Sequence, residues 1–179
     1  MLISNNYISL YTGNNQAIQI TKILLKYIDC NSVIVDANAG MGGNSSNFCK
    51  NFKYVYCIDN SSEAIIYLEH NLSNFNNKYI INDNCLDIIK IIKYDAIFFD
   101  PPWGGSSYKY KNIINLYLDN ININAIIESL YLYSNIKLVS LKAPFNFNIN
   151  YFTKWTINVH TIFKNNLKDT LFKLIIFTR

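Results

Sequence analysis

The stretch V-I-V-D-A-N-A-G-M-G-G-N, residues 33–44, runs from a short apolar segment into a turn that contains three glycines. Val33-Ile34-Val35 predicts a buried strand, and the pattern after the turn predicts a helix over 44–51. Glycines so close together let the backbone approach a ligand, although an ordinary tight turn between a strand and a helix has the same composition. This strand, turn and helix predict an α/β fold.

The same alternation of strands and helices continues along the chain. We expect strands at 54–58, 79–82, 94–99 and 136–141, and helices at 14–28, 61–72, 86–92, 124–133 and briefly near Ile149. Asn14 and either Ser61 or Ser62 are the expected helix caps. Segments 155–163 and 170–177 predict a closing hairpin with Asn165-Asn166 in its turn. Such a pattern forms a parallel sheet covered on both faces, and the hairpin adds an antiparallel strand.

The length of 179 residues suits one domain, 1–179, with residues 1–30 as a short N-terminal helical extension. Half of the residues are hydrophobic, so a core can be buried, and Ile, Leu and Phe interrupt the Asn-rich stretches. The heavy use of Asn, Ile, Tyr and Phe fits an AT-rich genome, such as that of a protist or a large DNA virus. A net charge of +4 is compatible with a polyanionic partner but is not evidence for one.

Several classes of protein are disfavoured by the sequence. The four cysteines form no C-x-x-C pair and the two histidines, His70 and His160, lie far apart, so we expect no metal site and reduced thiols. No signal peptide precedes the first apolar segment, and no apolar run approaches the roughly 20 residues of a membrane span. We therefore expect a protein inside the cell, in the cytoplasm or nucleus, or in a viral factory if the source is a virus.

Polar or glycine-rich residues follow each of the first four predicted strands. They are 36–43, Asp59, 83–85 and 100–103. Ligands of open parallel sheets bind at the carboxyl ends of the strands, so this coincidence predicts a nucleotide-type site. Asp59 could accept both hydroxyls of a ribose, or it could cap the next helix. Asn84 could bind an adenine amino group through its amide oxygen, or it could be only a turn residue.

The segment Asp100-Pro101-Pro102-Trp103 is the most specific signal. Two prolines stiffen the backbone just past a strand, which fixes a carboxylate, a backbone carbonyl and an aromatic ring around one small space. The acceptors can orient the hydrogens of a base amino group, and the ring can hold the base by stacking. This predicts transfer of a methyl group from S-adenosylmethionine to an exocyclic amine, largely by positioning and without a strong general base. The alternative is a proline-rich turn beside a core tryptophan.

A longer match extends this signal. Residues 100–108, D-P-P-W-G-G-S-S-Y, resemble the S-P-P-W-G-G-P-x-Y motif of the trimethylguanosine synthases, which are cap-specific guanine-N2 methyltransferases. Residues 35–44 resemble the V-D-A-F-C-G-V-G-G-N segment of that family, and 163–168 are similar to its F-x-N-x-K-L-K segment. The resemblance runs from about Thr12 onward, so the chain corresponds to a minimal catalytic domain.

The resemblance implies a Rossmann-like class I methyltransferase fold, a mostly parallel seven-stranded sheet with helices on both faces and a C-terminal antiparallel hairpin. It implies S-adenosylmethionine as cofactor and a capped RNA, already methylated at guanine N7, as substrate and partner. We expect a monomer. The implied catalytic residues are Asp100, Pro101, Pro102 and Trp103. The implied cofactor-binding residues are Thr12, Asp36, Asn38, Gly40, Gly42, Asn44, Asp59, Asn60, Asn84, Cys85 and Asp100. The implied substrate-binding residues are Trp103, Gly104, Tyr108, Lys109, Lys142 and Asn146.

Three departures from the family pattern matter. Asp100 stands where the family has Ser, and Asp is also what many N6-adenine methyltransferases carry. Asn84 replaces an adenine-binding Asp. The family's P-R-N appears here as residues 142–146, K-A-P-F-N, without the arginine that would face the cap phosphates. We hypothesise that Lys142, Lys109 or Lys111 supplies that charge, although Lys109 and Lys111 could equally belong to a solvated loop.

Two other functions stay open from the sequence. One is an N6-adenine or N2-guanine methyltransferase that acts on ribosomal RNA, other RNA or DNA. The other is a methyltransferase fold that binds a cap or nucleotide without turnover, which the replacement at Asn84 keeps in consideration.

Overall fold

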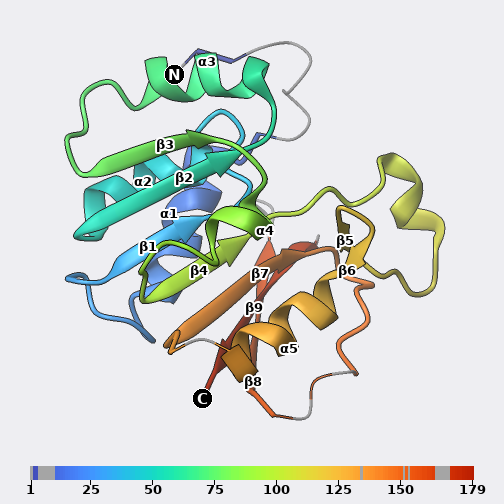
Figure 1. Cartoon of the computed structure of the whole chain (residues 1–179). Coiled ribbons are helices and arrows are strands. Elements are labelled where there is room, and N and C mark those ends of the chain that lie inside the picture. The colour runs from blue at the N-terminus through green and yellow to red at the C-terminus, as the bar shows by residue number, and fades with distance from the viewer. Residues whose placement is uncertain (1, 4–10, 134, 151, 153, 164–169) are drawn as a thin grey trace. The chain divides into compact units, whose positions relative to one another are not determined.

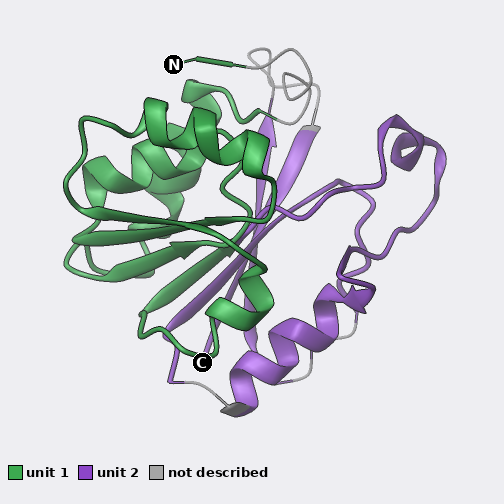
Figure 2. Ribbon diagram, turned by 45° about the horizontal axis from the view of Figure 1, so that its top comes forward, with its two compact units in different colours: residues 1–98 green, residues 99–179 purple. Residues whose placement is uncertain are grey.

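The computed structural model describes residues 2–3, 11–133, 135–150, 152, 154–163 and 170–179. The chain divides into two compact units, residues 1–98 and residues 99–179, which Figure 2 draws in different colours. The first unit carries the glycine turn, and the second carries the Asp-Pro-Pro-Trp segment.

The first unit is a parallel sheet whose strands are joined by helices (Figure 1). Its strands lie in the order β3-β2-β1-β4, and each neighbouring pair is parallel. Helices α1 and α2 lie together behind β1 and β2 in Figure 1. The elements are α1 (Asn14–Leu24), β1 (Val33–Asp36), α2 (Gly43–Asn51), β2 (Tyr54–Asp59), α3 (Ser62–Asn71), β3 (Lys78–Asn82), α4 (Cys85–Ile88) and β4 (Ala96–Phe99).

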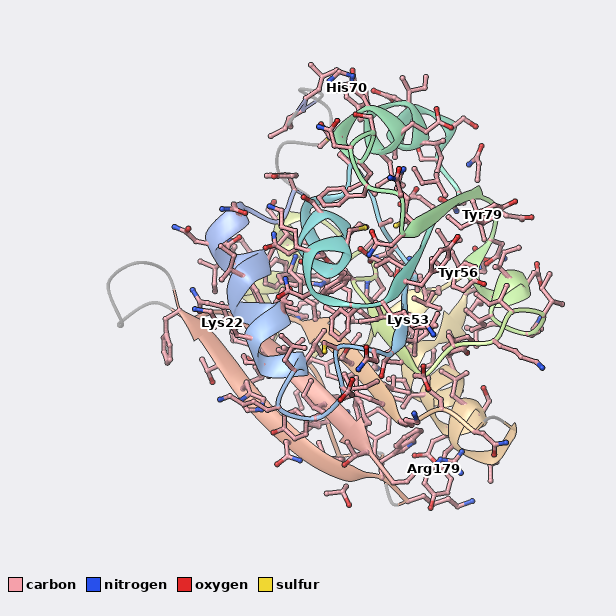
Figure 3. All side chains as sticks on the ribbon, turned by 90° about the vertical axis from the view of Figure 1, so that its left-hand side faces the viewer. Lys22, Lys53, Tyr56, His70, Tyr79 and Arg179 are labelled. Carbon is pink, nitrogen blue, oxygen red and sulfur yellow. The ribbon has the colours of Figure 1, made fainter. Side chains whose placement is uncertain are left out.

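The two faces of β2 differ in their side chains. Val55 and Cys57 are fully buried, whereas Tyr54 and Tyr56 point to the other face and are half-buried. Tyr56 pairs in register with Tyr79 of β3 (Figure 3). Their ring centroids lie 6.4 Å apart. One face of the strand therefore belongs to the core, and the other carries a row of tyrosines.

The second unit is an antiparallel arrangement of three long strands in the order β7-β9-β8. All six residues of β7 are buried, and β9 lies between β7 and β8. The elements are η2 (Ser106–Tyr110), a 3-10 helix, followed by β5 (Tyr117–Leu118), β6 (Ile121–Asn122), α5 (Ile123–Tyr133), β7 (Leu138–Ala143), β8 (Thr156–Phe163) and β9 (Thr170–Thr178). The four parallel strands of the first unit and these three are the seven strands that the sequence predicts.

Some local predictions were wrong. The first helix ends at Leu24 and not at Ile28. Its N-cap is Gly13 and not Asn14, and the N–H of Gly13 donates to the Gln16 side chain at 3.0 Å. The helix expected over 86–92 is the short α4 followed by turns.

The C-terminal half holds the remaining differences. No helix forms near Ile149 in the described residues; instead Phe147 makes a parallel bridge to Ile114, and backbone hydrogen bonds join the two segments. The 3-10 helix and the β5-β6 ribbon were not predicted. Asn165-Asn166, the expected hairpin turn, lie outside the described residues.

Candidate functional site

The glycine turn of the first unit is fixed by backbone hydrogen bonds to two strands. The N–H of Ala37 donates to the carbonyl of Phe98 and that of Ala39 donates to the carbonyl of Ile58, each at 2.9 Å. Gly40 and Gly42 have φ of 52° and 88°, in the left-handed region that favours glycine. The turn is therefore shaped before any ligand binds.

The glycines of this turn serve different purposes. A Cβ on Gly43 would lie 2.5 Å from the carbonyl oxygen of Thr12, and one on Gly42 would lie 2.9 Å from Leu68 Cδ1. Packing against backbone requires glycine at position 43, whereas at position 42 the near atom ends a leucine side chain and the φ of 88° is the stronger reason for glycine. At Gly40, apart from its chain neighbours, no described residue comes within 4 Å of the position that a Cβ would take.

Asp59 lies at the end of β2 and binds the glycine turn directly. Its Oδ2 accepts from the N–H of Gly40 at 2.8 Å, and its Oδ1 accepts from the N–H of Ser61 at 2.9 Å. The cap of α3 is Ser61, whose Oγ accepts from the Ala64 N–H. Each carboxylate oxygen has a second lone pair, so Asp59 retains the capacity to accept from a ribose.

Three further predicted residues lie around the turn and are buried. Asp36 accepts a hydrogen bond from the Ser45 hydroxyl at 2.6 Å and is fully buried. The amide nitrogen of Asn44 donates to the Thr12 hydroxyl at 3.2 Å, while its Oδ1 is buried without a hydrogen-bond partner among the described residues. Asn44 therefore offers one acceptor that a ligand or water could use.

Asn84 and Cys85 start α4. The side-chain oxygen of Asn84 accepts from the N–H of Leu86 at 2.9 Å, so Asn84 is the N-cap of this helix, and Cys85 is buried. This bond gives Asn84 a structural role as a helix cap, whereas the sequence indicated only a turn residue as the alternative to adenine binding. Burial raises the pKa of the nearby Tyr94 hydroxyl to about 12, and Cys85 contributes a smaller part of this rise. Asn38 is half-buried and Asn60 is exposed.

In the second unit, the carboxylate of Asp100 forms an ion pair. Lys142 of β7 donates from its Nζ to Asp100 Oδ2 at 2.7 Å, and the two side chains are only 10% and 15% exposed. The same ammonium lies 5.7 Å from the centroid of the Trp103 ring and 5.1 Å from that of Phe172. Lys142 is therefore engaged with Asp100, and its hypothesised role as a cation for cap phosphates stays a prediction.

Trp103 is held in an aromatic cluster. Its ring packs edge-on against Tyr108, with centroids 5.2 Å apart and an interplanar angle of 89°, and against Phe172 at 6.5 Å. Tyr108 in turn contacts Phe145 at 6.3 Å, and burial raises the pKa of the Tyr108 hydroxyl. The indole Nε1 of Trp103 is buried and has no hydrogen-bond partner in the described part of the chain.

The turn that carries Tyr108 is tied down by Asn146. The Asn146 amide nitrogen donates to the carbonyls of Tyr108 and Lys111, at 2.9 and 2.6 Å, and its Oδ1 is buried without a partner among the described residues. The preceding Gly104 and Gly105 are exposed and have φ of 83° and 74°. Asn146, a predicted substrate residue, thus also fixes the shape of the loop.

The other residues of this segment differ in exposure. Pro101 is buried and Pro102 is exposed. Lys109 and Lys111 are both exposed, and Lys109 Nζ lies 6.0 Å from the centroid of the Tyr108 ring. They are the hypothesised phosphate-binding lysines that the structure leaves at the surface.

The sequence did not predict several members of the two groups. Ser45, Phe145 and Phe172 were not expected to contact site residues. Ser45 lies two residues after the glycines on the first turn of α2, which is a signal that could have found it. Phe172 depends on the fold of β9, which no local pattern reveals. Among the described residues, no group of three or more His, Cys, Asp or Glu could hold a metal ion. The described helices include none with the length and apolar character to cross a membrane.

Residues 31–171 match the family model of the RNA cap guanine-N2 methyltransferases. The chain belongs to that family. The resemblance inferred from the two motifs is thereby confirmed. The chain is 30% identical to uncharacterized protein L320 of Acanthamoeba polyphaga mimivirus, over 92% of this chain and 76% of that protein. It is 29% identical to trimethylguanosine synthase of Saccharomyces cerevisiae, over 70% of this chain but only 42% of the yeast protein.

Similarity extends to other methyltransferases. A cobalt-precorrin-6B C(15)-methyltransferase of Methanococcus maripaludis is 25% identical over 76% of this chain and 72% of its own length. Among solved structures, an rRNA methylase of Streptococcus thermophilus has a TM-score of 0.64 at 14% identity, covering 90% of this chain and 95% of its own. A Streptococcus mutans protein described as a methyltransferase, solved in complex with S-adenosylhomocysteine (SAH), has a TM-score of 0.60 at 18% identity and covers 99% of both chains.

These similarities establish the general class. The fold is that of the class I methyltransferases, as predicted, and the chain is an S-adenosylmethionine-dependent methyltransferase. The roles of individual residues remain predictions.

Proposed function

We propose that this enzyme methylates the exocyclic N2 of guanosine in an RNA 5′ cap and produces di- or trimethylguanosine caps. The observation that carries the proposal is the Asp100-Pro101-Pro102-Trp103 segment, with its carboxylate paired and its ring held in an aromatic cluster. Family membership supports guanine N2 as the target. The similarity to the yeast trimethylguanosine synthase supports a capped substrate.

The residues of the first unit fit the methyl donor. The open backbone at Gly40 suits close approach by a ligand, and Asp59 retains acceptor capacity for the ribose hydroxyls. The unpartnered Oδ1 of Asn44 is a buried acceptor beside the same turn. We assign Asn84 and Cys85 to the adenine end, because an amide oxygen can accept more than one hydrogen bond and the capping bond to Leu86 does not exclude adenine.

When bound, S-adenosylmethionine supplies a methyl group on a sulfonium, which is already activated for transfer. The chain's own task is therefore to bind and orient the base. Asp100 and the backbone carbonyl of Pro101 accept hydrogens of the base amine, and Trp103 stacks on the base. Pro101 and Pro102 restrict the backbone that carries these groups.

The Trp103 ring favours a cationic base. N7-methylguanine carries a positive charge, and stacking a cation on tryptophan contributes about 0.5–2 kcal/mol. The buried Oδ1 acceptor of Asn146 in this unit lacks a partner among the described residues. A guanine edge offers N–H donors that such an acceptor can bind. Lys109 and Lys111, exposed on the same segment, are the cations that we assign to the cap phosphates.

One observation favours a second function. Asp100 stands where the family motif has serine, and many N6-adenine methyltransferases carry Asp at this position; the solved structures with a similar fold include an rRNA methylase. The alternative is therefore an N6-adenine or N2-guanine methyltransferase acting on ribosomal RNA, other RNA or DNA.

The deciding experiment compares three acceptors with labelled methyl donor. They are an N7-methylated cap dinucleotide, an unmethylated cap dinucleotide and an adenine-containing RNA without a cap. The proposal expects label on the cap guanine, with the N7-methylated form preferred, and mass spectrometry of the nucleosides would locate it at N2. Transfer to adenine alone would contradict the cap proposal and support the alternative.

A further inference from the structure

Lys142 is an unusual residue for its position. It lies in β7, whose six residues are all buried and which pairs with β9 in register, Lys142 opposite Leu174. Lysine is rarely buried unless its charge is paired. Here the partner is Asp100, 42 residues earlier, at 2.7 Å.

The chemistry of the pair defines the state of Asp100. An ammonium has three donors and no acceptor, so at this distance Asp100 accepts, and a neighbouring ammonium favours the carboxylate over the protonated acid. The ammonium is also bounded by the rings of Trp103 and Phe172, at 5.7 and 5.1 Å from their centroids. One lysine therefore contacts both the acceptor and the stacking ring of the Asp-Pro-Pro-Trp segment.

Both partners are held by their backbone. Lys142 is inside a paired strand, and Asp100 directly follows β4 and precedes two prolines, which restrict the backbone. The ion pair between these two positions orients the carboxylate. The family motif has a neutral serine in the place of Asp100, so the carboxylate and its ammonium form a charge-balanced replacement for a neutral acceptor.

We propose that Lys142 is a positioning residue that keeps the Asp100 carboxylate ionised and oriented to accept a hydrogen bond from the amino group of the substrate base. The inference rests on the proposed function only in requiring a base amine, and it holds for guanine and adenine alike. A protonated Asp100 would donate toward the amine lone pair, which must stay available for methylation. Among the described titratable groups, Tyr108 packs edge-on against the Trp103 ring and Lys109 lies over the Tyr108 ring. His160 of β8 stands in register with Leu174, the residue opposite Lys142.

The first test measures ionisation without relying on activity. The full chain is labelled at aspartate carboxyl carbons, and the Asp100 resonance is identified as the one missing in Asp100→Asn. In Lys142→Met, the Asp100 resonance should titrate at clearly higher pH than in the unsubstituted protein, because a buried carboxylate without its cation takes up a proton more readily. Titration at unchanged pH in Lys142→Met would overturn the proposal, whether or not the protein is active.

The second test measures catalysis over about pH 5–9, where an unperturbed carboxylate is ionised. Lys142→Met should lower kcat about 100-fold near neutral pH, keep the donor KM within about twofold and move the acid limb of the profile to higher pH. Lys142→Arg should restore a large part of kcat. Lys154→Met removes the same charge from an exposed position of the same unit and should behave like the unsubstituted enzyme.

The double variant Asp100→Ser/Lys142→Met is the control for misfolding of Lys142→Met. It removes both charges together, so it should be more stable to heat and more active than Lys142→Met alone. A merely structural role predicts recovery of stability, no shift of the acid limb and no rescue of kcat by arginine, and that result would overturn the proposal. Unsubstituted protein that methylates none of the three acceptors would contradict the proposed function, while the carboxyl titration would still decide the role of Lys142.

Discussion

Asp59 and Asn84 of the first unit and Asp100 of the second are held in place by different kinds of contact. In the first unit, Asp59 and Asn84 accept from backbone N–H groups, those of Gly40, Ser61 and Leu86. In the second unit, the key contact joins two charged side chains, Asp100 and Lys142, across 42 positions of sequence.

This difference determines how each group responds to substitution. Backbone donors are present whatever the sequence, so a residue that caps a turn needs only to keep its own acceptor. A side-chain pair needs both partners, because the loss of one removes the opposite charge that balances the other in a buried place. We expect the first unit to be sensitive to backbone geometry and the second to the identity of a few side chains.

The largest effect should come from Trp103→Ala. Loss of base stacking should lower kcat/KM for the acceptor about 100-fold, while the donor Kd changes by less than about twofold. Steady-state kinetics and calorimetry with the donor measure the two quantities. Tyr79→Ala, an exposed aromatic of the first unit, is the control and should change neither. An equal loss of donor binding and activity in Trp103→Ala would contradict the stacking role.

A pair of glycine substitutions should separate packing from backbone strain. Gly43→Ala places a methyl 2.5 Å from the Thr12 carbonyl and should lower the free energy of unfolding by about 2–3 kcal/mol, although alanine favours a helix. Gly104→Ala meets no neighbouring atom but must adopt φ of 83°, which should cost about 1 kcal/mol. Urea unfolding of both variants measures the difference. The reverse order would refute the packing argument for the glycine turn.

Asp59→Ala should weaken donor binding about 30-fold, since charge-assisted hydrogen bonds contribute about 1.5–3 kcal/mol. At saturating donor, kcat should be nearly unchanged, because Asp59 lies in the binding turn and takes no part in orienting the base. Calorimetry and donor-dependent kinetics check both expectations. Glu69→Ala removes an exposed acid from α3 and should leave donor affinity as it was. An unaltered Kd for the donor in Asp59→Ala would show that Asp59 has only a structural role in the turn.

The smallest effect concerns Tyr94 of the first unit, whose buried hydroxyl has no hydrogen-bond partner among the described residues. Its pKa is raised from 10 to about 12 by burial. Below pH 10 the hydroxyl is neutral in both folded and unfolded chains. Between pH 10 and about 12 the unfolded chain ionises first, so stability falls as pH rises.

Tyr94→Phe should lack this fall. At neutral pH the variant should differ by less than about 0.5 kcal/mol, and the gap should grow to about 1–2 kcal/mol above pH 10. Unfolding of the two proteins in urea across this range gives the difference directly. If the free energy of unfolding changed with pH in the same way in both proteins, the Tyr94 hydroxyl would be hydrated in the folded protein.

The sequence predicted most of the fold because its strands and caps are local features. Val33 to Asp36 and Tyr54 to Asp59 form the expected strands, and Ser61 caps α3 as expected. The first helix was drawn too long because apolar spacing continues to Ile28, although the helix ends at Leu24. The 3-10 helix and the β5-β6 ribbon have no apolar period of their own, so hydrophobic periodicity does not predict them.

The site shows the same limit. Asp59 beside Gly40 could be predicted, because the carboxyl ends of neighbouring parallel strands meet at one edge of a sheet. Lys142 was selected from sequence as a phosphate-binding cation, since nothing local shows that its ammonium points to Asp100. Phe172 was not considered at all. Contacts between side chains distant in sequence depend on the folded arrangement of β7 and β9.

The placement of Trp103 gives the protein an optical reporter of its own. The chain has two tryptophans, and the other, Trp155, is buried against Tyr131 with ring centroids 4.9 Å apart. In Trp155→Phe, all indole fluorescence would come from the ring that we expect to stack on the base. Quenching of that emission would then report acceptor binding in real time, without a label and without turnover.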